Sequence, residues 1–397
     1  MHICFICREY PPSLRGGGIA SYQKEMAEGL TALGHRVTVI CASDDTRNYS
    51  TQTTGNLTVI RLSGGDFIIP KVESNSLTKR FRTFFRYHSY RKQIRKAVEK
   101  IDDIDIIEVP DFGAESLYIQ NLDIPVVVRL HTPALMDHYT FGILPLNKST
   151  IKYYWQGKHE FKAIKSAQFI SSCSSSLKKW TIDNLKVDPL KITILPNLID
   201  TSNSTDQVWK PTEEEGYHIL YVGTICDWKG CNDLCKAVEI LHHNGVNVQL
   251  TMIGKSGSYA QTLQKQYEHA PWLDMKGFIP RNELLHRYVE SDLVCFPSWW
   301  ENFPMVCLEA MLNGAIVLGS NSGGMQEIIE ESKNGFLITP KNPQTLAIKI
   351  KDILEMPIEI KQNISHQARA TIINKYSKEV VLQKTLKFYQ DCIKHYK

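Results

Sequence analysis

Short apolar runs alternate with helical patterns along most of the chain, and this alternation restricts the fold more than any other feature. In the first half, strands are predicted at HICFIC, RVTVICAS, LTVIRL, DIIEV, PVVVRLH, QFISSCS and ITILPN. Between the first two lies an amphipathic helical pattern, GGGIASYQKEMAEGLTALGH, which contains a glycine near its end, where helices often stop. Apolar strands separated by helices predict an α/β fold whose parallel sheet is covered on both faces.

The alternation is interrupted once and then restarts. Residues 201–216, TSNSTDQVWKPTEEEG, are polar, contain proline and glycine, and predict a linker. A second parallel sheet is predicted at HILYVGTI, VQLTMIG, DMKGF, LVCFPS, AIVLGS and GFLITP. A chain of 397 residues is longer than one hydrophobic core usually serves. We therefore expect an N-terminal domain at 1–200, a C-terminal domain at 217–377, and a last helix at 378–397 that packs back on the first domain.

Composition narrows the class of protein. The apolar fraction of 43% and the charged fraction of 22% are ordinary for a globular enzyme, and a net charge of +4 is too small to indicate a nucleic-acid binder. We expect no membrane span and no signal peptide, because no long uncharged apolar run and no leader pattern are present. Most of the ten cysteines lie in apolar runs, and Cys226, Cys231 and Cys235 fit no zinc spacing well. Buried free thiols and a cytoplasmic location are therefore expected.

The loops after the strands are expected to carry the chemistry, because open parallel sheets bind ligands beyond the carboxyl ends of their strands. The first strand is followed by REYPPSLRGGGIA, whose glycines allow close backbone approach and offer amides at a helix start. A dinucleotide site is the weaker interpretation. Ser21 stands at the third glycine position of that fingerprint, although Asp44 resembles a ribose-binding acid.

Three further strand-end residues have both a functional and a plain interpretation. His131 ends the strand in RLHTP and Asp111 follows the strand in EVPDFG, so each is expected near a ligand, while a structural histidine is the alternative. Lys229 precedes a helix start in CDWKG, where its ammonium suits a phosphate. A solvated surface lysine is the alternative there.

The segment ENFPMVCLEAM contains Glu301 and Glu309 with seven residues between them. Pro304 fits the first turn of a helix, so the free amides of Met305 and Val306 are expected to point toward a ligand. A sugar diphosphate fits this arrangement, with phosphates on the amides and sugar hydroxyls on the carboxylates. The alternative is an acid that favours the helix dipole and a second acid that faces solvent.

Together these motifs resemble the retaining glycosyltransferases of family 4. The most specific part is the E-x7-E pair in ENFPMVCLEAM, preceded by SDLVCFPS and followed by GSNSGGMQEII. Supporting parts are RGGGIAS, RLHTP, ILPNLID and VGTICDWKG, so the resemblance covers nearly the whole chain. It implies the GT-B fold, in which two Rossmann-like parallel-sheet domains face a central cleft.

The resemblance also implies roles for individual residues. Catalytic roles fall to His131, Glu301 and Lys229. Glu309 is similar to the acid that binds the donor ribose, Glu301 to the acid on the donor sugar, and Lys229 to the diphosphate lysine. The nucleotide-sugar site further includes Gly17, Gly18, Thr224, Gly254, Phe278, Ile279, Asn302, Phe303, Pro304, Met305 and Val306. On the acceptor side the expected residues are Arg15, Asp111 and His131.

One position departs from the family pattern. Thr224 stands where the family often has an arginine that helps neutralise the diphosphate, and Arg15 is the candidate that would compensate.

The expected reaction is the transfer of a hexose, glucose as first choice, from a UDP-sugar to a glycan or lipid-linked saccharide, with retention. No metal cofactor is expected, and Asp103 and Asp105 in KIDDIDIIEV are interpreted as structural. No carboxylate suited to double displacement is evident in the sequence, which favours front-side attack. Two alternatives remain open: a sugar-nucleotide epimerase of the same fold and a non-catalytic sugar-nucleotide sensor.

Residues 79–96, KRFRTFFRYHSYRKQIRK, combine eight basic residues with aromatic ones and contain no acid. This mixture is typical of contact with an anionic membrane surface or a lipid-linked acceptor, and a solvated helix is the alternative. A second basic and aromatic stretch, KYYWQGKHEFKAIK, begins at Lys152. We expect a cytoplasmic protein with peripheral contact at the inner face of the membrane, and no nucleic-acid partner because no reading motif is present.

Overall fold

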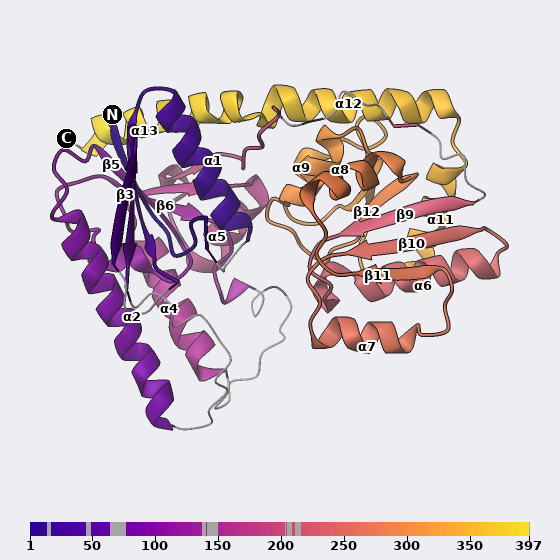
Figure 1. Ribbon diagram of the computed structural model, residues 1–397, viewed down its shortest axis with the longest axis horizontal. Helices are drawn as coiled ribbons and strands as arrows, with labels where there is room; N and C mark the ends of the chain where they lie inside the picture. The colour runs from indigo at the N-terminus through magenta and orange to yellow at the C-terminus, as the bar shows by residue number, and fades with distance from the viewer. Residues whose placement is uncertain are drawn as a thin grey trace. The chain divides into compact units, whose positions relative to one another are not determined.

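The computed structural model describes residues 1–13, 17–44, 49–63, 77–136, 140, 150–202, 204, 209–210 and 216–396, with backbone alone at 77–84 and 152. The chain divides into two compact units (Figure 1). The first unit consists of Met1–Leu198 together with Lys378–Lys397, and the second of Ile199–Ser377. Each unit is built on its own sheet.

The first unit has an eight-stranded sheet in the order β3-β4-β2-β1-β5-β6-β7-β8. Its strands are β1 (His2–Ile6), β2 (Arg36–Ala42), β3 (Ser50–Thr54), β4 (Leu57–Leu62), β5 (Ile106–Pro110), β6 (Val126–Leu130), β7 (Phe169–Ser172) and β8 (Ile192–Ile194). Neighbouring strands are parallel except β3 and β4. All seven apolar runs of the first half form strands. The added strand β3, STQTT, is polar and exposed, so the apolar pattern did not predict it.

Helices cover this sheet, and one of them comes from the end of the chain. They are α1 (Gly18–Ala32), α2 (Leu77–Val98), α4 (Ile151–Ser166), α5 (Ser175–Leu185) and α13 (Lys378–Tyr396). Short 3-10 helices lie at η2 (Glu115–Tyr118) and η3 (Pro189–Lys191). Helix α13 packs on α1, where Leu382 and Tyr389 share a buried cluster with Tyr22 and Met26. The expected last helix therefore belongs to the core of the first unit.

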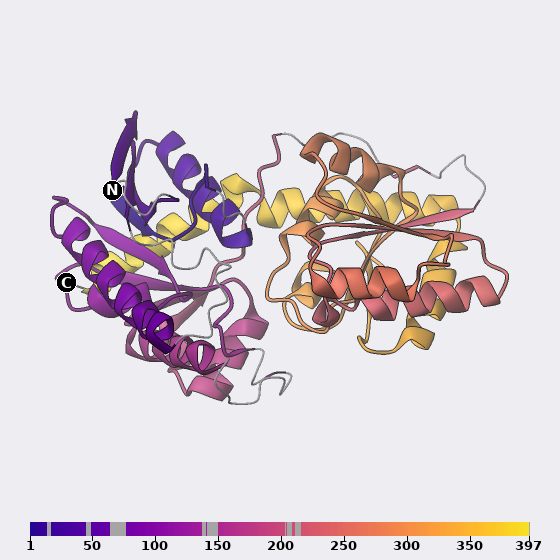
Figure 2. The same ribbon diagram turned by 60° about the horizontal axis from the view of Figure 1, so that its bottom comes forward.

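The second unit has a six-stranded parallel sheet in the order β11-β10-β9-β12-β13-β14. Its strands are β9 (Tyr217–Val222), β10 (Val248–Ile253), β11 (Leu273–Lys276), β12 (Leu293–Phe296), β13 (Val317–Ser320) and β14 (Phe336–Ile338). The helical elements are η4 (Asp227–Lys229), α6 (Cys231–His243), α7 (Ser258–Gln266), α8 (Arg281–Glu290), α9 (Met305–Leu312), α10 (Met325–Ile328), α11 (Pro343–Leu354) and α12 (Ile358–Tyr376). Figure 2 shows this sheet nearly edge-on with helices on both of its faces, as continuous apolar strands require.

The described part of the stretch expected to be a linker includes a core residue. Trp209 is fully buried in the hydrophobic cluster of the second unit. Its backbone amide donates to Ser365 Oγ at 3.1 Å, and its indole N–H donates to the Ser291 carbonyl at 3.0 Å. This part of the stretch is therefore anchored to the second unit.

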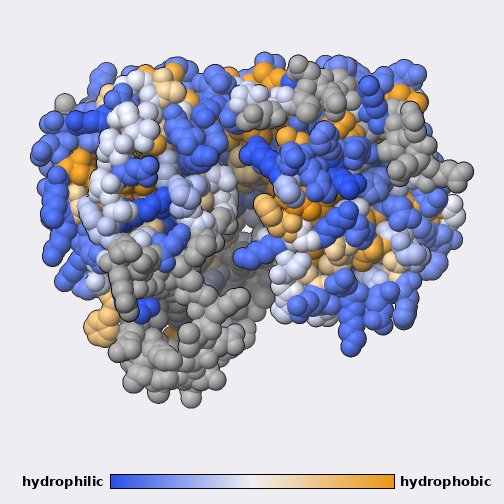
Figure 3. All heavy atoms as spheres, in the orientation of Figure 1, coloured by the Kyte–Doolittle hydropathy of each residue, from blue (hydrophilic) through white to orange (hydrophobic). Residues whose placement is uncertain are grey.

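The surface seen in Figure 3 is mostly hydrophilic, with small hydrophobic areas between the charged side chains. Among the described residues, no helix is long and apolar enough to cross a membrane. All ten cysteines are free thiols, and all but the half-buried Cys226 are buried. This agrees with the interpretation of the cysteines as small apolar core residues.

Candidate active site

The loops after β9 and β12 come together at the carboxyl edge of the second sheet. Strand order reverses between these strands, because β10 and β11 lie beyond β9 while β13 and β14 lie beyond β12. Open α/β sheets bind ligands at such a switch point. Lys229, after β9, forms an ion pair with Glu301, after β12. Ser298 Oγ donates a hydrogen bond to the same Glu301 oxygen at 2.8 Å. The fold thus joins two residues that are 72 positions apart in the sequence.

Two glycines allow the backbones of these loops to approach closely. Gly230 has φ 72°, and a Cβ there would lie 2.2 Å from the Pro297 carbonyl oxygen. Gly323 has φ 68°, and a Cβ there would lie 2.1 Å from the Glu301 carbonyl oxygen. That same oxygen accepts the amide of Gly324 at 2.6 Å. The backbone of Glu301 is therefore fixed by the loop that follows β13.

The two acids of the E-x7-E pair lie on either side of the start of α9. Pro304 is the N-cap of this helix, one position before the first turn in which the sequence placed it. Glu301 lies in the preceding loop, and Glu309 is the fifth helical residue. Burial raises the pKa of Glu309, while nearby Arg281 and the Tyr288 hydroxyl act in the opposite direction. The first amides of a helix have no acceptor within it, so those of Met305 and Val306 suit an anion.

The other residues expected in the donor site occupy several neighbouring loops. Thr224 is exposed after β9, and its carbonyl accepts the Tyr221 hydroxyl at 2.8 Å. Gly254 follows β10, and the Asn302 side chain accepts the Trp300 indole N–H at 2.7 Å.

Two further residues of the expected nucleotide-sugar site lie further along the sheet. Phe278, which is 91% exposed, and half-buried Ile279 follow the edge strand β11, with β10 between it and β9. Phe303, by contrast, is buried and packs against Tyr376, a residue that the sequence did not single out.

In the first unit the strand order reverses between β1 and β5. Asp111, directly after β5, accepts the amide of Phe112 at 2.9 Å and the amide of His131, directly after β6, at 3.2 Å. Burial, together with the Arg129 guanidinium, lowers the pKa of His131 well below its usual value, so the imidazole is neutral. Burial and then nearby Glu160 raise the pKa of Asp111 to about 8. The fold therefore brings together Asp111 and His131, two of the three residues expected on the acceptor side.

Sequence reasoning missed Glu160, which lies beside them on α4 and is fully buried. Its Oε1 accepts the amide of Gly113 at 2.8 Å and the Gln156 side-chain amide at 2.9 Å. Its Oε2 accepts the amide of Ala134 at 2.7 Å. One carboxylate thus holds the loops after β5 and β6. The available signal was that Glu160 is the single acid in the basic and aromatic stretch KYYWQGKHEFKAIK.

The glycine loop is described only in part. Gly17 is the N-cap of α1 with an extended backbone, and both Gly17 and Gly18 are exposed. Arg15, the proposed compensating cation, lies outside the described residues.

The basic stretch 79–96 forms part of α2, with described side chains from Phe85 onward. Its charges do not all face solvent. Arg91 is buried and donates to the Gly113 carbonyl at 2.6 Å, whereas Arg86, Lys92 and Lys96 are exposed beside Phe85, which is 72% exposed.

The two aspartates interpreted as structural have structural contacts. Asp105 Oδ2 accepts the backbone amide of His2 at 2.7 Å, and Asp103 lies 3.9 Å from the Arg36 guanidinium. Within the described part of the chain, no three His, Cys, Asp or Glu side chains gather as a metal site would require.

Comparison with known proteins indicates the family and the fold of the chain. The family model Glycosyltransferase Family 4 matches residues 16–203, and the model Glycosyl transferases group 1 matches residues 203–371. An uncharacterized glycosyltransferase of Methanocaldococcus jannaschii is 26% identical over 98% of both chains. Sucrose-phosphate synthase from Thermosynechococcus elongatus has a similar structure, with a TM-score of 0.77, 17% identity and 98% of both chains covered. HepE of Anabaena, solved in complex with UDP-glucose, gives a TM-score of 0.69 at 17% identity, covering 98% of this chain and 100% of that one. Together, the two adjoining family models and the shared fold identify the chain as a glycosyltransferase of the family 4 type with the GT-B fold.

Proposed function

We propose that this glycosyltransferase transfers a hexose, glucose as first choice, from a UDP-sugar to a glycan or lipid-linked saccharide, with retention and without a metal ion. The observation that carries the proposal is the ion pair between Lys229 and Glu301 beside the start of α9. A cation, a carboxylate and free helix amides at one switch point match the diphosphate and the sugar of a nucleotide-sugar donor.

The donor site in the second unit supplies charge stabilisation. When the sugar–phosphate bond breaks, negative charge develops on the diphosphate, and Lys229 with the first amides of α9 would stabilise it. Because Lys229 pairs with Glu301, the donor phosphate has to share or replace that carboxylate as the ammonium's partner. The choice of UDP-glucose is supported by the similar fold of HepE, which was solved with that donor.

The residues expected on the acceptor side, in the first unit, do not offer a covalent nucleophile. The imidazole of His131 is neutral, and Asp111 keeps its proton up to about pH 8, since burial raises its pKa to about 8. A protonated acid is a poor nucleophile, which favours front-side attack over double displacement. In that step the acceptor oxygen forms a bond to the anomeric carbon, and the bond between this carbon and the donor's phosphate oxygen breaks. The proton of the acceptor hydroxyl passes to the departing phosphate oxygen.

The acceptor is proposed to be presented at an anionic membrane surface. The support is on α2, where exposed Arg86, Lys92 and Lys96 accompany the exposed apolar side chain of Phe85. Co-sedimentation with vesicles of mixed neutral and anionic lipid tests this. Binding that requires the anionic lipid and weakens with salt is expected, and equal behaviour with neutral vesicles would contradict it.

A thermal-shift panel with UDP, GDP, ADP and NAD, each with and without EDTA, tests the donor. A ligand well above its dissociation constant stabilises the folded protein measurably. Stabilisation by UDP that EDTA leaves unchanged is expected. Preference for GDP or ADP would change the donor, and stabilisation by NAD alone would overturn the proposed reaction.

A turnover assay distinguishes a glycosyltransferase from the two alternatives, an epimerase and a non-catalytic sensor. UDP-glucose incubated with an acceptor should release UDP and give a glycosylated product. Conversion of the UDP-sugar without an acceptor would indicate an epimerase, and binding without any turnover would indicate a sensor.

A further inference from the structure

Helix α12 lies antiparallel along α9, the helix whose start carries the proposed donor site. Near the far end of α9, Ser365 Oγ donates to the Gly314 carbonyl at 2.6 Å, and Arg369 Nη1 donates to the Leu312 carbonyl at 2.7 Å. Near its beginning, the ring of Tyr376 packs edge-to-face on that of Phe303, with centroids 5.4 Å apart. Residues 365, 369 and 376 fall on one face of α12 because their spacings are close to whole helical turns. One face of α12 therefore contacts both ends of α9.

Tyr376 also contacts α10, a second element beside the same site. Its hydroxyl donates to the Glu327 carbonyl at 2.9 Å, in α10. This helix directly follows Gly323 and Gly324, the residues that meet the backbone of Glu301. A single buried side chain thus touches the loop that precedes α9 and the segment that supports the Glu301 backbone.

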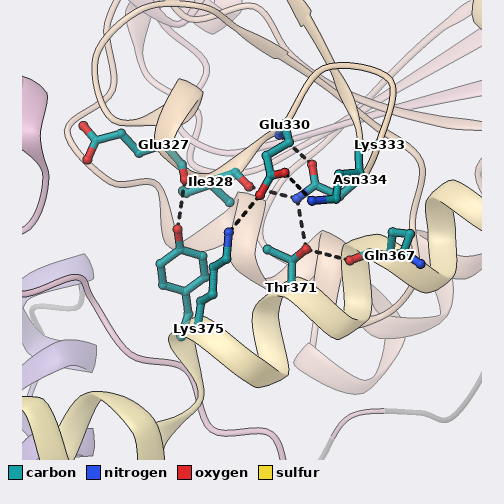
Figure 4. A network of polar contacts seen from close by, with 9 residues as sticks. Glu327, Ile328, Glu330, Lys333, Asn334, Gln367, Thr371 and Lys375 are labelled. Carbon is teal, nitrogen blue, oxygen red and sulfur yellow. Dashed lines mark hydrogen bonds and ion pairs between the residues drawn. The ribbon is translucent and has the colours of Figure 1, made fainter.

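A polar network fixes the end of α12 that bears Tyr376 (Figure 4). The Glu330 carboxylate accepts from Lys333 at 2.6 Å and from Lys375 at 2.8 Å. The buried Asn334 side chain accepts the amide of Glu330 at 2.7 Å and donates to Thr371 Oγ1 at 3.1 Å. The two lysines lower the pKa of Glu330 to about 2, so this carboxylate stays charged at every ordinary pH. The last two turns of α12 are therefore tied to the segment between α10 and β14.

The backbone of Tyr376 also lies where the chain enters and leaves the second unit. Its carbonyl accepts the amide of Ile199 at 3.0 Å, and Ile199 pairs with Ser377 in a parallel bridge. Ile199 and Ser377 are the first and last residues of the second unit. The backbone of Tyr376 thus contacts Ile199, where the chain enters the second unit. Its side chain contacts Phe303, before α9, and Glu327, in α10.

We propose that Tyr376 is a positioning residue for the donor site. Its ring holds the loop before α9 in place, and its hydroxyl holds α10 in place. Together these contacts keep Glu301 beside Lys229 and the first amides of α9. The proposal rests on the assigned donor site and adds a residue that contacts neither the sugar nor the phosphate.

Tyr376→Phe tests this, because it removes the hydrogen bond to Glu327 and keeps the ring on Phe303. In the protein without ligand, amide hydrogen exchange in peptides covering 299–306 and 321–329 should become faster. The UDP dissociation constant and the KM for the donor should rise about three- to tenfold, as loss of one hydrogen bond allows. The KM for the acceptor should stay the same. Tyr396→Phe is the matched control, since Tyr396 donates to the Leu122 carbonyl at the same 2.9 Å in the first unit.

A double-mutant comparison adds a second readout. Phe303→Leu should weaken UDP binding by itself, and its effect should be non-additive with that of a Tyr376→Leu change, which removes the same ring contact. Additive effects, unchanged exchange in both peptides of Tyr376→Phe, or equal changes in Tyr396→Phe would each overturn the positioning role. The exchange measurement needs no ligand. If UDP fails to bind the unaltered protein, the donor assignment fails, while exchange still decides the role of Tyr376.

Discussion

At the scale of single residues, Lys229 has the clearest expected effect. Lys229→Ala removes the cation that would face the departing diphosphate, so kcat/KM should fall by about 10²–10³, with weaker UDP binding. Steady-state kinetics and calorimetric titration with UDP measure the two effects. Lys349→Ala is the control, because Lys349 is also ion-paired in the second unit, with Glu331 at 2.7 Å, away from the donor loops. Normal binding and turnover in Lys229→Ala would show that the donor lies elsewhere.

Glu309 is expected to contribute to UDP binding more than to turnover. Its position inside α9 suits a ribose hydroxyl, which does not change during the reaction. Glu309→Ala should therefore raise the UDP dissociation constant by about tenfold, as loss of a hydrogen bond to a charged group allows, and leave kcat at saturating donor nearly constant. A large fall in kcat with unchanged affinity would contradict a ribose contact.

Asp111 should make the stability of the protein depend on pH. Its pKa is about 8 in the folded protein and near the ordinary aspartate value of 3.8 when unfolded. Between these values the folded state holds a proton that the unfolded state lacks, so this contribution is complete below about pH 4 and is lost as pH rises toward 8. Asp111→Asn should flatten that decline. Unfolding midpoints at pH 5 and pH 8.5 measure it, with exposed Asp188→Asn as the control. Equal slopes in all three proteins would contradict the burial effect.

The sequence could predict residues whose position follows from a strand end, and it could not predict residues placed by packing. Asp111 and His131 follow neighbouring parallel strands, so their closeness follows from the sheet. Glu160 and Tyr376 lie on helices, and each bonds a backbone group that is distant in the sequence, the Ala134 amide and the Glu327 carbonyl respectively. No local pattern encodes such partners.

At the scale of elements, the glycine at the start of α6 can be compared with the one after its end. Gly230 and Gly245 have similar φ angles, 72° and 78°. A Cβ at Gly245 meets open space, whereas one at Gly230 would lie 2.2 Å from the Pro297 carbonyl oxygen. Gly245→Ala should cost about 1–2 kcal/mol for the left-handed backbone alone. Gly230→Ala should cost more and should also weaken UDP binding, because the Pro297 loop leads to Glu301. Equal losses of unfolding free energy in both variants, measured by denaturant unfolding, would mean that the Pro297 backbone does not restrict the side chain at position 230.

The strands show where apolar patterning is sufficient. Every run expected to be a strand forms one. Strands such as β1 and β12 are buried along their whole length, and a strand buried on both faces has to be apolar. Strand β3 escaped prediction because it is an exposed edge strand, paired antiparallel with β4, and its five residues are all exposed. Its position is determined by pairing and not by burial.

At the scale of the whole molecule, the chain returns to its first unit only through its last helix. The first unit combines residues 1–198 with 378–397, so part of its core comes from the segment that follows the second unit. The helix itself was predictable from its pattern. Its partner surface includes Gly29, where a Cβ would lie 2.5 Å from Leu382, and this absence of a side chain gives no apolar signal in the sequence.

Leu382 therefore tests whether the last helix is part of the first core. Leu382→Ala removes a buried side chain that packs against α1 and should destabilise the first unit by about 2–5 kcal/mol. Hydrogen exchange should become faster in peptides from β1 and α1, while peptides from β9 and β12 keep their protection, because the two units have separate cores. Gln383→Ala, at the exposed neighbouring position, is the matched control. Faster exchange in both units, or in neither, would mean that α13 does not stabilise the first unit specifically, and the boundary between the units would have to be drawn elsewhere.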